Sequence, residues 1–230
     1  MSINVVVLTG AGISAESGLG TFRAADGLWE AHRIEDVATP EAFMRNPGLV
    51  HDFYNARRRQ LRDVEPNAAH WALAEFEKAH DGDFLLITQN VDDLHKRAGS
   101  RQLASMHGDL LSMRCLACDT VAKIQEDLSA AAVCQSCNQS GVLRPDIVWF
   151  GEMPYHLSPI HDALSCCGLF VAIGTSGNVY PAAGFVQTAK AAGARCIELN
   201  LEKTSGEHFF DDSRYGPASK TVPGFFDSLY

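Results

Sequence analysis

The sequence lacks a long apolar run. Although 46% of its 230 residues are hydrophobic, no stretch reaches the roughly eighteen residues that a membrane-spanning helix needs. It also lacks an excess of positive charge, because 19 Lys and Arg stand against 28 Asp and Glu, for a net charge of −9. A nucleic-acid partner requires a basic face that neutralises phosphates. These absences argue against a membrane or nucleic-acid role, whereas basic protein segments around lysines are compatible partners.

The sequence also shows no targeting extension, internal repeat or low-complexity tract. Residues 1–4 lead directly into the first apolar segment, so we expect a cytoplasmic protein. A chain of this length can bury a sizeable core. Its alternating helix and strand patterns predict an α/β fold, with a Rossmann-like parallel sheet and a smaller inserted module.

The first apolar segment ends in a glycine turn. Residues 5–8 (VVVL) are typical of a buried strand, and Gly10, Gly12 and Ala15 then fit the pattern G-x-G-x-x-G/A. In that pattern, small residues let backbone N–H groups approach a dinucleotide pyrophosphate at a helix N-terminus. A tight turn in another kind of α/β protein is the alternative explanation, so the pattern alone does not decide the ligand.

Polar clusters follow three further predicted strands. Residues 84–88 lead into 89–95 (QNVDDLH), residues 169–173 into 174–178 (GTSGN), and residues 195–199 into 200–202 (NLE). A usual dehydrogenase has an acidic ribose ligand about twenty residues after the glycines, but here Asn200 and Glu202 are the candidates, with ordinary loop polarity as the alternative. Ligands of open parallel sheets bind outside the carboxyl ends of the strands. We therefore expect the four strand ends to form one crevice.

Four of the seven cysteines form two C-x-x-C pairs. Cys115 and Cys118 are followed, after fifteen intervening residues, by Cys134 and Cys137. This spacing predicts a tetrahedral site for one structural zinc ion with no open position. Disulfides or a redox C-x-x-C are alternatives that a reducing compartment disfavours. The other three cysteines, Cys166, Cys167 and Cys196, are expected to be small buried apolar residues.

These elements predict two structural units. Residues 1–28, 68–106 and 151–230 are expected to build the Rossmann-like domain. A helical insertion at 29–67 and a zinc-binding module at 107–150 are expected to form the small domain.

In order, the motifs resemble those of the sirtuin family. The resemblance rests on residues 10–18 (GAGISAESG), 21–23 (TFR), 89–95, 107–108 (HG), the four cysteines, 144–152 (RPDIVWFGE) and 174–176 (GTS), and it covers nearly the whole chain. Residues 36–40 (DVATP) and 53–57 (FYNAR) make the chain most similar to the bacterial class III (CobB-type) members. The resemblance implies NAD-dependent removal of acyl groups from protein lysines. NAD is then a consumed co-substrate, and nicotinamide and an O-acyl-ADP-ribose are released.

The resemblance also implies catalytic roles. His107 is the base that accepts a proton from a ribose hydroxyl, although a lone histidine beside glycine is more often structural. The rival, His95, has no such role in the family. Asn90 and Asp92, beside Ile13 and Ser14, complement the nicotinamide carboxamide. The alternative for Asp92 is a helix N-cap.

Larger sets are implied for binding. The cofactor-binding residues are Gly10, Ala11, Gly12, Ile13, Ser14, Ala15, Glu16, Thr21, Phe22, Arg23, Trp29, Gln89, Asn90, Val91, Asp92, Gly174, Thr175, Ser176, Asn200, Leu201, Glu202 and Ala218. The substrate-binding residues are Ala38, Tyr54, Arg57, Val148, Phe150, Gly151, Glu152 and Val179. Residues 148–152 have strand character, and an acyl-lysine peptide is expected as an added strand between them and 177–180. Core packing is the alternative for the apolar members.

Acyl selectivity is implied by one helix face. Tyr54 and Arg57 are three residues apart on a predicted helix, where they can bind the carboxylate of a succinyl or malonyl group while Ala38 leaves room. The neighbouring Arg58 and Arg59 are expected to form a solvated basic face. We therefore predict deacetylase and desuccinylase activity together.

Three other functions remain open from the sequence. A protein mono-ADP-ribosyltransferase could use the same fold, a nicotinamide oxidoreductase is disfavoured by the missing ribose acid, and a non-catalytic zinc-ribbon module leaves the strand-end clusters unexplained. The sequence gives no indication of an oligomeric state.

Overall fold

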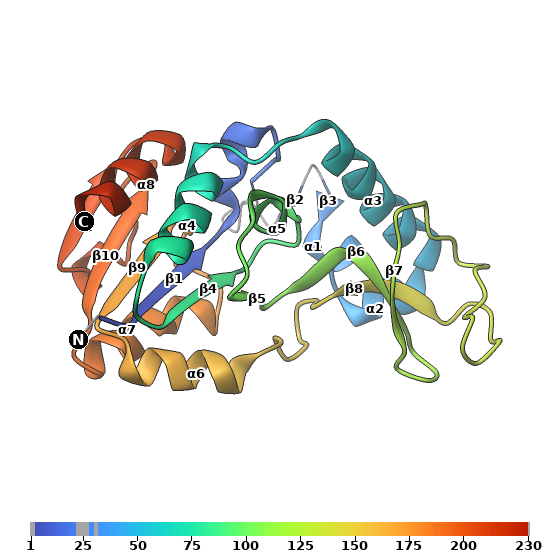
Figure 1. Cartoon of the computed structure of the whole chain (residues 1–230). Coiled ribbons are helices and arrows are strands. Elements are labelled where there is room, and N and C mark those ends of the chain that lie inside the picture. The colour runs from blue at the N-terminus through green and yellow to red at the C-terminus, as the bar shows by residue number, and fades with distance from the viewer. Residues whose placement is uncertain (1–2, 22–27, 30–31, 230) are drawn as a thin grey trace.

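The larger part of the molecule is a six-stranded sheet in the order β11-β10-β9-β1-β4-β5 (Figure 1). The computed structural model describes residues 3–21, 28–29 and 32–229, with 28–29 described by their backbone only. The strands are β1 (Val5–Thr9), β4 (Phe84–Thr88), β5 (Leu103–Ser105), β9 (Leu169–Ile173), β10 (Arg195–Asn200) and β11 (Asp212–Tyr215). Every pairing in this sheet is parallel, which confirms the predicted α/β fold class.

The winding of the sheet reverses at β1. The chain passes from β1 to β4 and β5 on one side, then returns to β9, β10 and β11 on the other. Ligands of such sheets bind at this switch point, outside the carboxyl ends of the strands. The predicted glycine turn and polar clusters follow β1, β4, β9 and β10, so the topology brings these strand ends to one edge.

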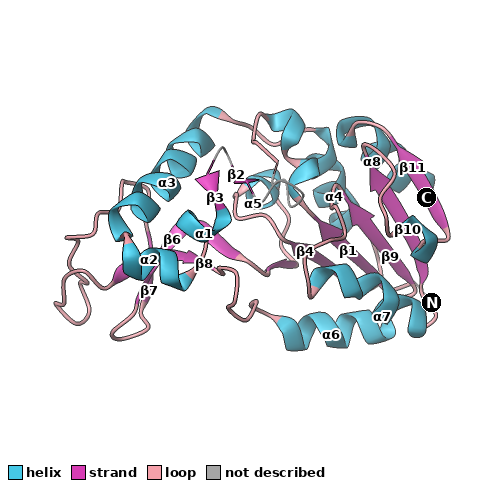
Figure 2. Cartoon of the chain, turned by 180° about the vertical axis from the view of Figure 1, so that it is seen from behind, coloured by secondary structure: helices cyan, strands magenta, loops and turns pink. Residues whose placement is uncertain are grey.

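Helices cover both faces of the sheet (Figures 1 and 2). α4 (Ala68–Ala79) and α8 (Ala218–Phe226) pack on one face, and α6 (Leu157–Cys166) and α7 (Phe185–Ala191) on the other. Successive residues of β1 alternate between the two resulting cores. Burial on both faces explains why β1 and β9 read as continuous apolar runs. No helix in the described part of the chain is long and apolar enough to span a membrane.

The smaller part joins a three-stranded antiparallel sheet to a group of helices. The sheet has the order β7-β6-β8, with β6 (Gly108–Cys115), β7 (Val121–Lys123) and β8 (Leu143–Ile147). The remaining elements are β2 (Leu28–Trp29), β3 (His32–Arg33), α1 (Ile34–Val37), α2 (Pro40–Arg45), α3 (Pro47–Gln60) and α5 (Leu94–Ala98). α2 and α3 each begin with a proline that follows an N-cap residue. The N-cap side chains, those of Thr39 and Asn46, accept hydrogen bonds from the backbone N–H groups of Ala42 and Leu49.

Short 3₁₀ helices complete the chain. They are η1 (Ala11–Ile13), η2 (Ala15–Ser17), η3 (Leu61–Asp63), η4 (Ala182–Gly184), η5 (Glu207–Phe209) and η6 (Asp227–Leu229). The glycine turn thus leads into two 3₁₀ helices, not into the N-terminus of an α-helix.

Three local predictions are wrong. Residues 148–152 are not a strand, because β8 ends at Ile147 and the Glu152 N–H donates to the Trp149 carbonyl to close a turn. Arg58 is not solvated but 1% exposed, since α3 packs against the zinc module and the guanidinium donates to Leu110 and Glu126 carbonyls. Cys166 is exposed near the end of α6, whereas Cys167 and Cys196 are buried as predicted.

Candidate active site

A cleft of about 730 Å³ lies at the carboxyl ends of the parallel strands, between the sheet and the smaller part. From the cofactor prediction it is lined by Gly10, Ala11, Gly12, Ser14, Ala15, Glu16, Thr21, Gln89, Asn90, Val91, Asp92, Gly174, Thr175, Ser176, Asn200, Leu201, Glu202 and Ala218. From the catalytic and substrate predictions it is lined by His107, Ala38, Tyr54, Arg57, Val148, Phe150, Gly151, Glu152 and Val179. The fold therefore brings residues from distant parts of the sequence into one cavity.

The floor of the cleft is made by two glycine turns in close contact. The N–H of Gly12 donates to the carbonyl of Gly174, and that of Gly10 to Ile173. A Cβ on Gly12 would lie 2.7 Å from the Gly174 Cα, and one on Gly174, where φ is +59°, would lie 2.5 Å from the Ile13 nitrogen. Glycine is thus required because the turns after β1 and β9 pack backbone to backbone.

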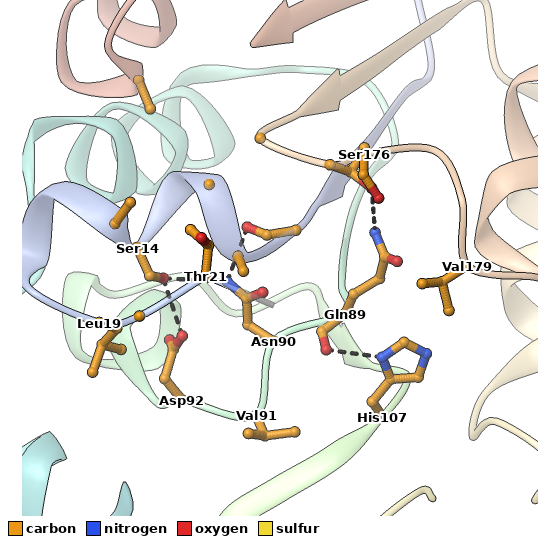
Figure 3. A pocket seen from close by; sticks show the side chains of 18 of the residues that line it. Ser14, Leu19, Thr21, Gln89, Asn90, Val91, Asp92, His107, Ser176 and Val179 are labelled. Atoms are coloured by element: carbon orange, nitrogen blue, oxygen red, sulfur yellow. Dashed lines mark hydrogen bonds between the residues drawn. The ribbon is translucent and has the colours of Figure 1, made fainter. Parts of the chain in front are cut away.

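Ser14, Asn90 and Asp92 form a hydrogen-bonded group on one wall (Figure 3). The Ser14 hydroxyl donates to Asp92 Oδ2 at 3.0 Å. The Asn90 amide donates to Ser14 Oγ at 3.2 Å and to the Gly10 carbonyl at 3.1 Å. Since both Asn90 amide hydrogens are used, its carbonyl oxygen is the atom that can accept a hydrogen bond from a ligand.

The alternative role of Asp92 as a helix N-cap is wrong, because the residue that precedes α5 in the N-cap position is Asp93. Asp92 Oδ1 accepts the Leu94 N–H at 3.1 Å, which helps to begin α5, while Oδ2 takes the Ser14 hydroxyl. Burial raises the pKa of the Asp92 carboxyl to about 6, although the hydrogen bonds from Leu94 and Ser14 oppose that shift. The carboxylate is therefore held in place for contact with a polar ligand.

Two buried histidines lie behind this wall. His70 Nδ1 accepts the Asn67 N–H at 3.2 Å, so the proton is on Nε2, which lies 3.4 Å from Ser14 Oγ. The His95 ring centroid is 4.8 Å away, and His95 Nε2 lies 3.0 Å from the Thr9 hydroxyl. Burial lowers the pKa of both rings. Both are neutral packing residues, and His70 is the one that contacts Ser14.

His107 lies on the opposite side of the cleft, at the start of β6. Its Nδ1 lies 2.9 Å from the Gln89 carbonyl. A carbonyl only accepts, so Nδ1 carries the proton and Nε2 is left unprotonated on the cleft side of the ring (Figure 3). Burial lowers the pKa of His107, against the opposing effect of the Gln89 hydrogen bond. The neutral imidazole can thus accept a proton at Nε2.

Three predicted cofactor residues are engaged with the protein itself. Gln89 Nε2 donates to the Thr175 hydroxyl at 3.0 Å, and Asn200 donates to the Thr175 carbonyl at 2.8 Å. The Glu16 carboxylate accepts the backbone N–H and the hydroxyl of Ser219 in the first turn of α8. These contacts fix the turns that shape the cleft.

The far end of the cleft lies against α3. Tyr54 is fully buried, and its hydroxyl accepts the Trp149 indole N–H at 2.9 Å. One turn along, the Arg57 guanidinium lies 3.8 Å above the Phe53 ring and donates to the Phe53 carbonyl. Ala38 completes this wall, and its carbonyl accepts the Phe150 N–H. This end offers a phenol and a guanidinium beside apolar walls.

The four cysteines converge beyond the cleft. All four Sγ atoms lie within 4.8 Å of one another, with 3.7 Å between Cys115 and Cys137 and 3.8 Å between Cys118 and Cys134. A tetrahedral zinc ion with Zn–S bonds of about 2.3 Å requires sulfur separations of about 3.8 Å. The cluster therefore fits one structural zinc ion, and all four ligand positions are filled by thiolates.

Comparison with known proteins decides the family. Residues 10–181 match the model described as "Sir2 family". The chain belongs to the Sir2 family. It is 58% identical over 224 residues to a Bdellovibrio bacteriovorus protein named "NAD-dependent protein deacylase", covering 96% of this chain and 94% of that relative. The resemblance inferred from the motifs is thereby confirmed.

Solved Sir2 structures have the same fold. "Crystal structure of a Sir2 homolog-NAD complex" matches with a TM-score of 0.90 and 38% identity, covering 99% of this chain and 90% of that chain. "Sir2 bound to acetylated peptide" matches with a TM-score of 0.84 and 26% identity, covering 99% and 94%. The Rossmann-like sheet with its inserted cysteine module is thus a Sir2 fold.

Among the described residues of this Sir2 protein, Ile13 is a predicted site residue that does not line the cleft. The Ile13 side chain is buried in the core between α4, α8 and the sheet. Phe22 and Arg23 lie outside the described residues, as does the side chain of Trp29. For Ile13, Phe22, Arg23 and Trp29, the roles that the resemblance implied therefore stay predictions.

The cleft also contains residues that the sequence analysis missed. They include Leu19, Gln60, Leu61, Leu110, Ile147, Trp149, Lys203 and Pro217. Trp149 lay inside a quoted motif, so its indole N–H, which needs an acceptor when buried, could have indicated a polar contact. The others are apolar or loop residues, together with Gln60 at the end of α3, and their position depends on how distant elements pack.

Proposed function

We propose that this Sir2 protein is an NAD-dependent protein-lysine deacylase that removes succinyl and malonyl groups as well as acetyl groups. The observation that carries the proposal is His107, whose unprotonated Nε2 faces a cleft with glycine turns at one end and Tyr54 and Arg57 at the other. The relative's name, "NAD-dependent protein deacylase", supports the same activity.

NAD would lie along the strand ends. When bound, it would supply a ribose carbon that becomes reactive as nicotinamide departs. The backbone of residues 10–15 and 174–176 would bind the phosphates, and Asn200, Leu201 and Glu202 line the cleft nearby. Asn90 and Asp92 would take the nicotinamide carboxamide, because one offers a carbonyl oxygen and the other a carboxylate to its N–H groups. The Ser14 and Leu94 hydrogen bonds keep that carboxylate oriented.

His107 would act as the general base. Its Nε2 accepts the proton of a ribose hydroxyl as that oxygen attacks the substrate, while the Nδ1–H bond to the Gln89 carbonyl keeps the ring oriented. The first residue after β8 anchors this histidine as well, since the Val148 N–H donates to the His107 carbonyl. This hydrogen bond holds the proposed base next to the proposed peptide-binding segment.

The peptide would lie between residues 148–152 and 177–180. Val148, Gly151 and Val179 line the cleft from these two segments, and backbone pairing there suits substrates of varied sequence. A related structure is described as bound to acetylated peptide, which supports a peptide as the substrate. We propose that the protein is located in the cytoplasm, because a reducing compartment keeps the zinc-binding cysteines reduced.

Acyl selectivity provides a direct prediction. Arg57→Met and Tyr54→Phe should each impair desuccinylation far more than deacetylation. A charge-assisted hydrogen bond in a partly dry channel contributes about 1.5–3 kcal/mol, roughly ten- to a hundredfold, and an acetyl group has no carboxylate to make one. The measurement is kcat/KM on one peptide carrying either acyl group. Equal losses for both acyl groups in Arg57→Met would exclude the acid-binding role.

The reaction itself is tested with protein, NAD and an acylated lysine peptide. Deacylation releases nicotinamide and lowers the peptide mass. Mono-ADP-ribosyl transfer would release nicotinamide but raise the peptide mass, and an oxidoreductase would produce reduced nicotinamide absorbance. Either of the last two results, without deacylated peptide, would overturn the proposal.

A further inference from the structure

A series of contacts runs from Glu152, whose side chain is 29% exposed, to the buried Tyr54 hydroxyl. The Arg144 guanidinium binds both carboxylate oxygens of Glu152, at 2.6 and 2.9 Å. The same guanidinium lies 3.3 Å above the Trp149 ring, and the Trp149 indole N–H donates to Tyr54 Oη at 2.9 Å. The three contacts are an ion pair, a cation–π contact and a hydrogen bond.

The direction of the last hydrogen bond matters for the acyl pocket. An indole nitrogen is a donor only, so the Tyr54 oxygen must be the acceptor. Burial raises the pKa of the Tyr54 hydroxyl, against the effect of the Trp149 hydrogen bond, so the phenol keeps its proton. Because Trp149 fills an acceptor position of that oxygen, the Tyr54 hydrogen points away from the indole nitrogen. Both residues line the cleft beside Arg57.

We infer that Trp149 is a positioning residue for acyl selectivity: its indole N–H fixes the Tyr54 hydroxyl as a donor to the carboxylate of an acidic acyl group. The inference rests on the proposed deacylase function. It adds Trp149, which contacts Tyr54 through its indole nitrogen, to the residues that determine acyl selectivity. An acetyl group has no carboxylate to receive this hydrogen. Trp149 therefore acts on the choice between acyl groups.

The surroundings of Trp149 restrict its ring. Its own backbone N–H donates to Glu152 Oε2 at 2.7 Å, so the carboxylate that holds Arg144 also holds the Trp149 backbone. Phe43 packs against the indole with ring centroids 5.4 Å apart. Burial alone would raise the pKa of Glu152, but hydrogen bonds from Arg144 and the Trp149 N–H outweigh it and lower that pKa. The carboxylate thus stays charged and keeps both partners in place.

Trp149→Phe tests the inference, because it keeps an aromatic ring beneath Arg144 and removes the N–H donor. We expect kcat/KM for a succinyl-lysine peptide to fall about three- to tenfold relative to the acetyl-lysine peptide of the same sequence, mainly through KM. The matched control is Trp71→Phe, since Trp71 also donates one indole hydrogen bond, to the Pro66 carbonyl, but does not line the cleft. The control should leave the ratio of the two activities at its wild-type value.

A double-mutant cycle separates positioning from general damage. In a Tyr54→Phe background there is no hydroxyl to orient, so adding Trp149→Phe should leave the succinyl-to-acetyl ratio unchanged. A ratio that falls again in the double variant, or a Trp149→Phe protein that loses both activities equally, would overturn the inference.

The wild-type protein gives an independent readout if Trp149→Phe does not fold. The chain has three tryptophans, so its indole N–H resonances are few, and the one that moves in Tyr54→Phe identifies Trp149. A succinylated peptide should shift that resonance, whereas an acetylated peptide should shift it much less. Equal shifts would contradict the inference even if deacylation is confirmed, and absence of any deacylation by the wild type would contradict the proposed function instead.

Discussion

His107→Ala is expected to lower deacylation by roughly 10²–10⁴-fold, the usual effect of losing a positioned general base. Nicotinamide exchange should survive in part, because nicotinamide departs before the base is needed. The structure gives a specific reason for this choice of residue: the Gln89 carbonyl holds the proton on Nδ1 and leaves Nε2 able to accept one.

Single-turnover deacylation and exchange of labelled nicotinamide should be measured on the same preparation. His161→Ala is a suitable control, since His161 is exposed on α6 and does not line the cleft. Near-normal turnover by His107→Ala would remove His107 from the catalytic role. Loss of exchange to the same degree as deacylation would indicate damage to NAD binding.

The pH dependence of the wild type follows from the same residue. Burial lowers the pKa of His107, so the neutral, proton-accepting form persists below pH 6.5. Asp92, with a pKa raised by burial to about 6, loses its charge over a similar range. We expect kcat/KM to stay level above neutral pH and to fall as pH drops through about 6. An acid limb centred well above pH 7 would contradict these assignments.

Much of the site could be predicted because its residues follow strand ends. Gly10, Asn90, Gly174 and Asn200 lie at or within two residues of strand ends, and parallel strands bring their carboxyl ends to one edge. The apolar runs themselves were readable since both faces of the sheet are covered. The residue ranges of the two domains remain predictions, because they depend on packing rather than on pattern.

The errors came from contacts between distant segments. Arg58 looked solvated within a basic run, yet carbonyl groups of residues 110 and 126 surround it. Trp149 was read as part of a strand, but its indole and backbone are bound by Tyr54 and Glu152. The Arg58 partners are 52 and 68 positions away and Tyr54 is 95 positions from Trp149, and periodicity carries no information about contacts at such separations.

Removal of zinc is expected to abolish activity by unfolding the cysteine module. The core of this module is small, with four buried residues, Cys115, Leu128, Cys134 and Leu143, and so small a core does not hold a fold without a metal or disulfides. Structural zinc binding in small domains is worth about 10–16 kcal/mol. Cys134→Ser should therefore bind much less zinc, lose module structure and lose activity.

The link to activity is β6, which begins beside His107 and ends at Cys115. If the cysteine end of this strand loosens, the pairing of Gly108 with Ile147 and the position of His107 are lost with it. Chelation should thus inactivate the protein in step with zinc release, without competition from NAD or peptide, since four thiolates leave no metal position for substrate. Elemental analysis, circular dichroism and activity should be followed together, with Cys166→Ser as the control because Cys166 is exposed and outside the cluster. Full activity in protein shown to contain no zinc would end this account of the module.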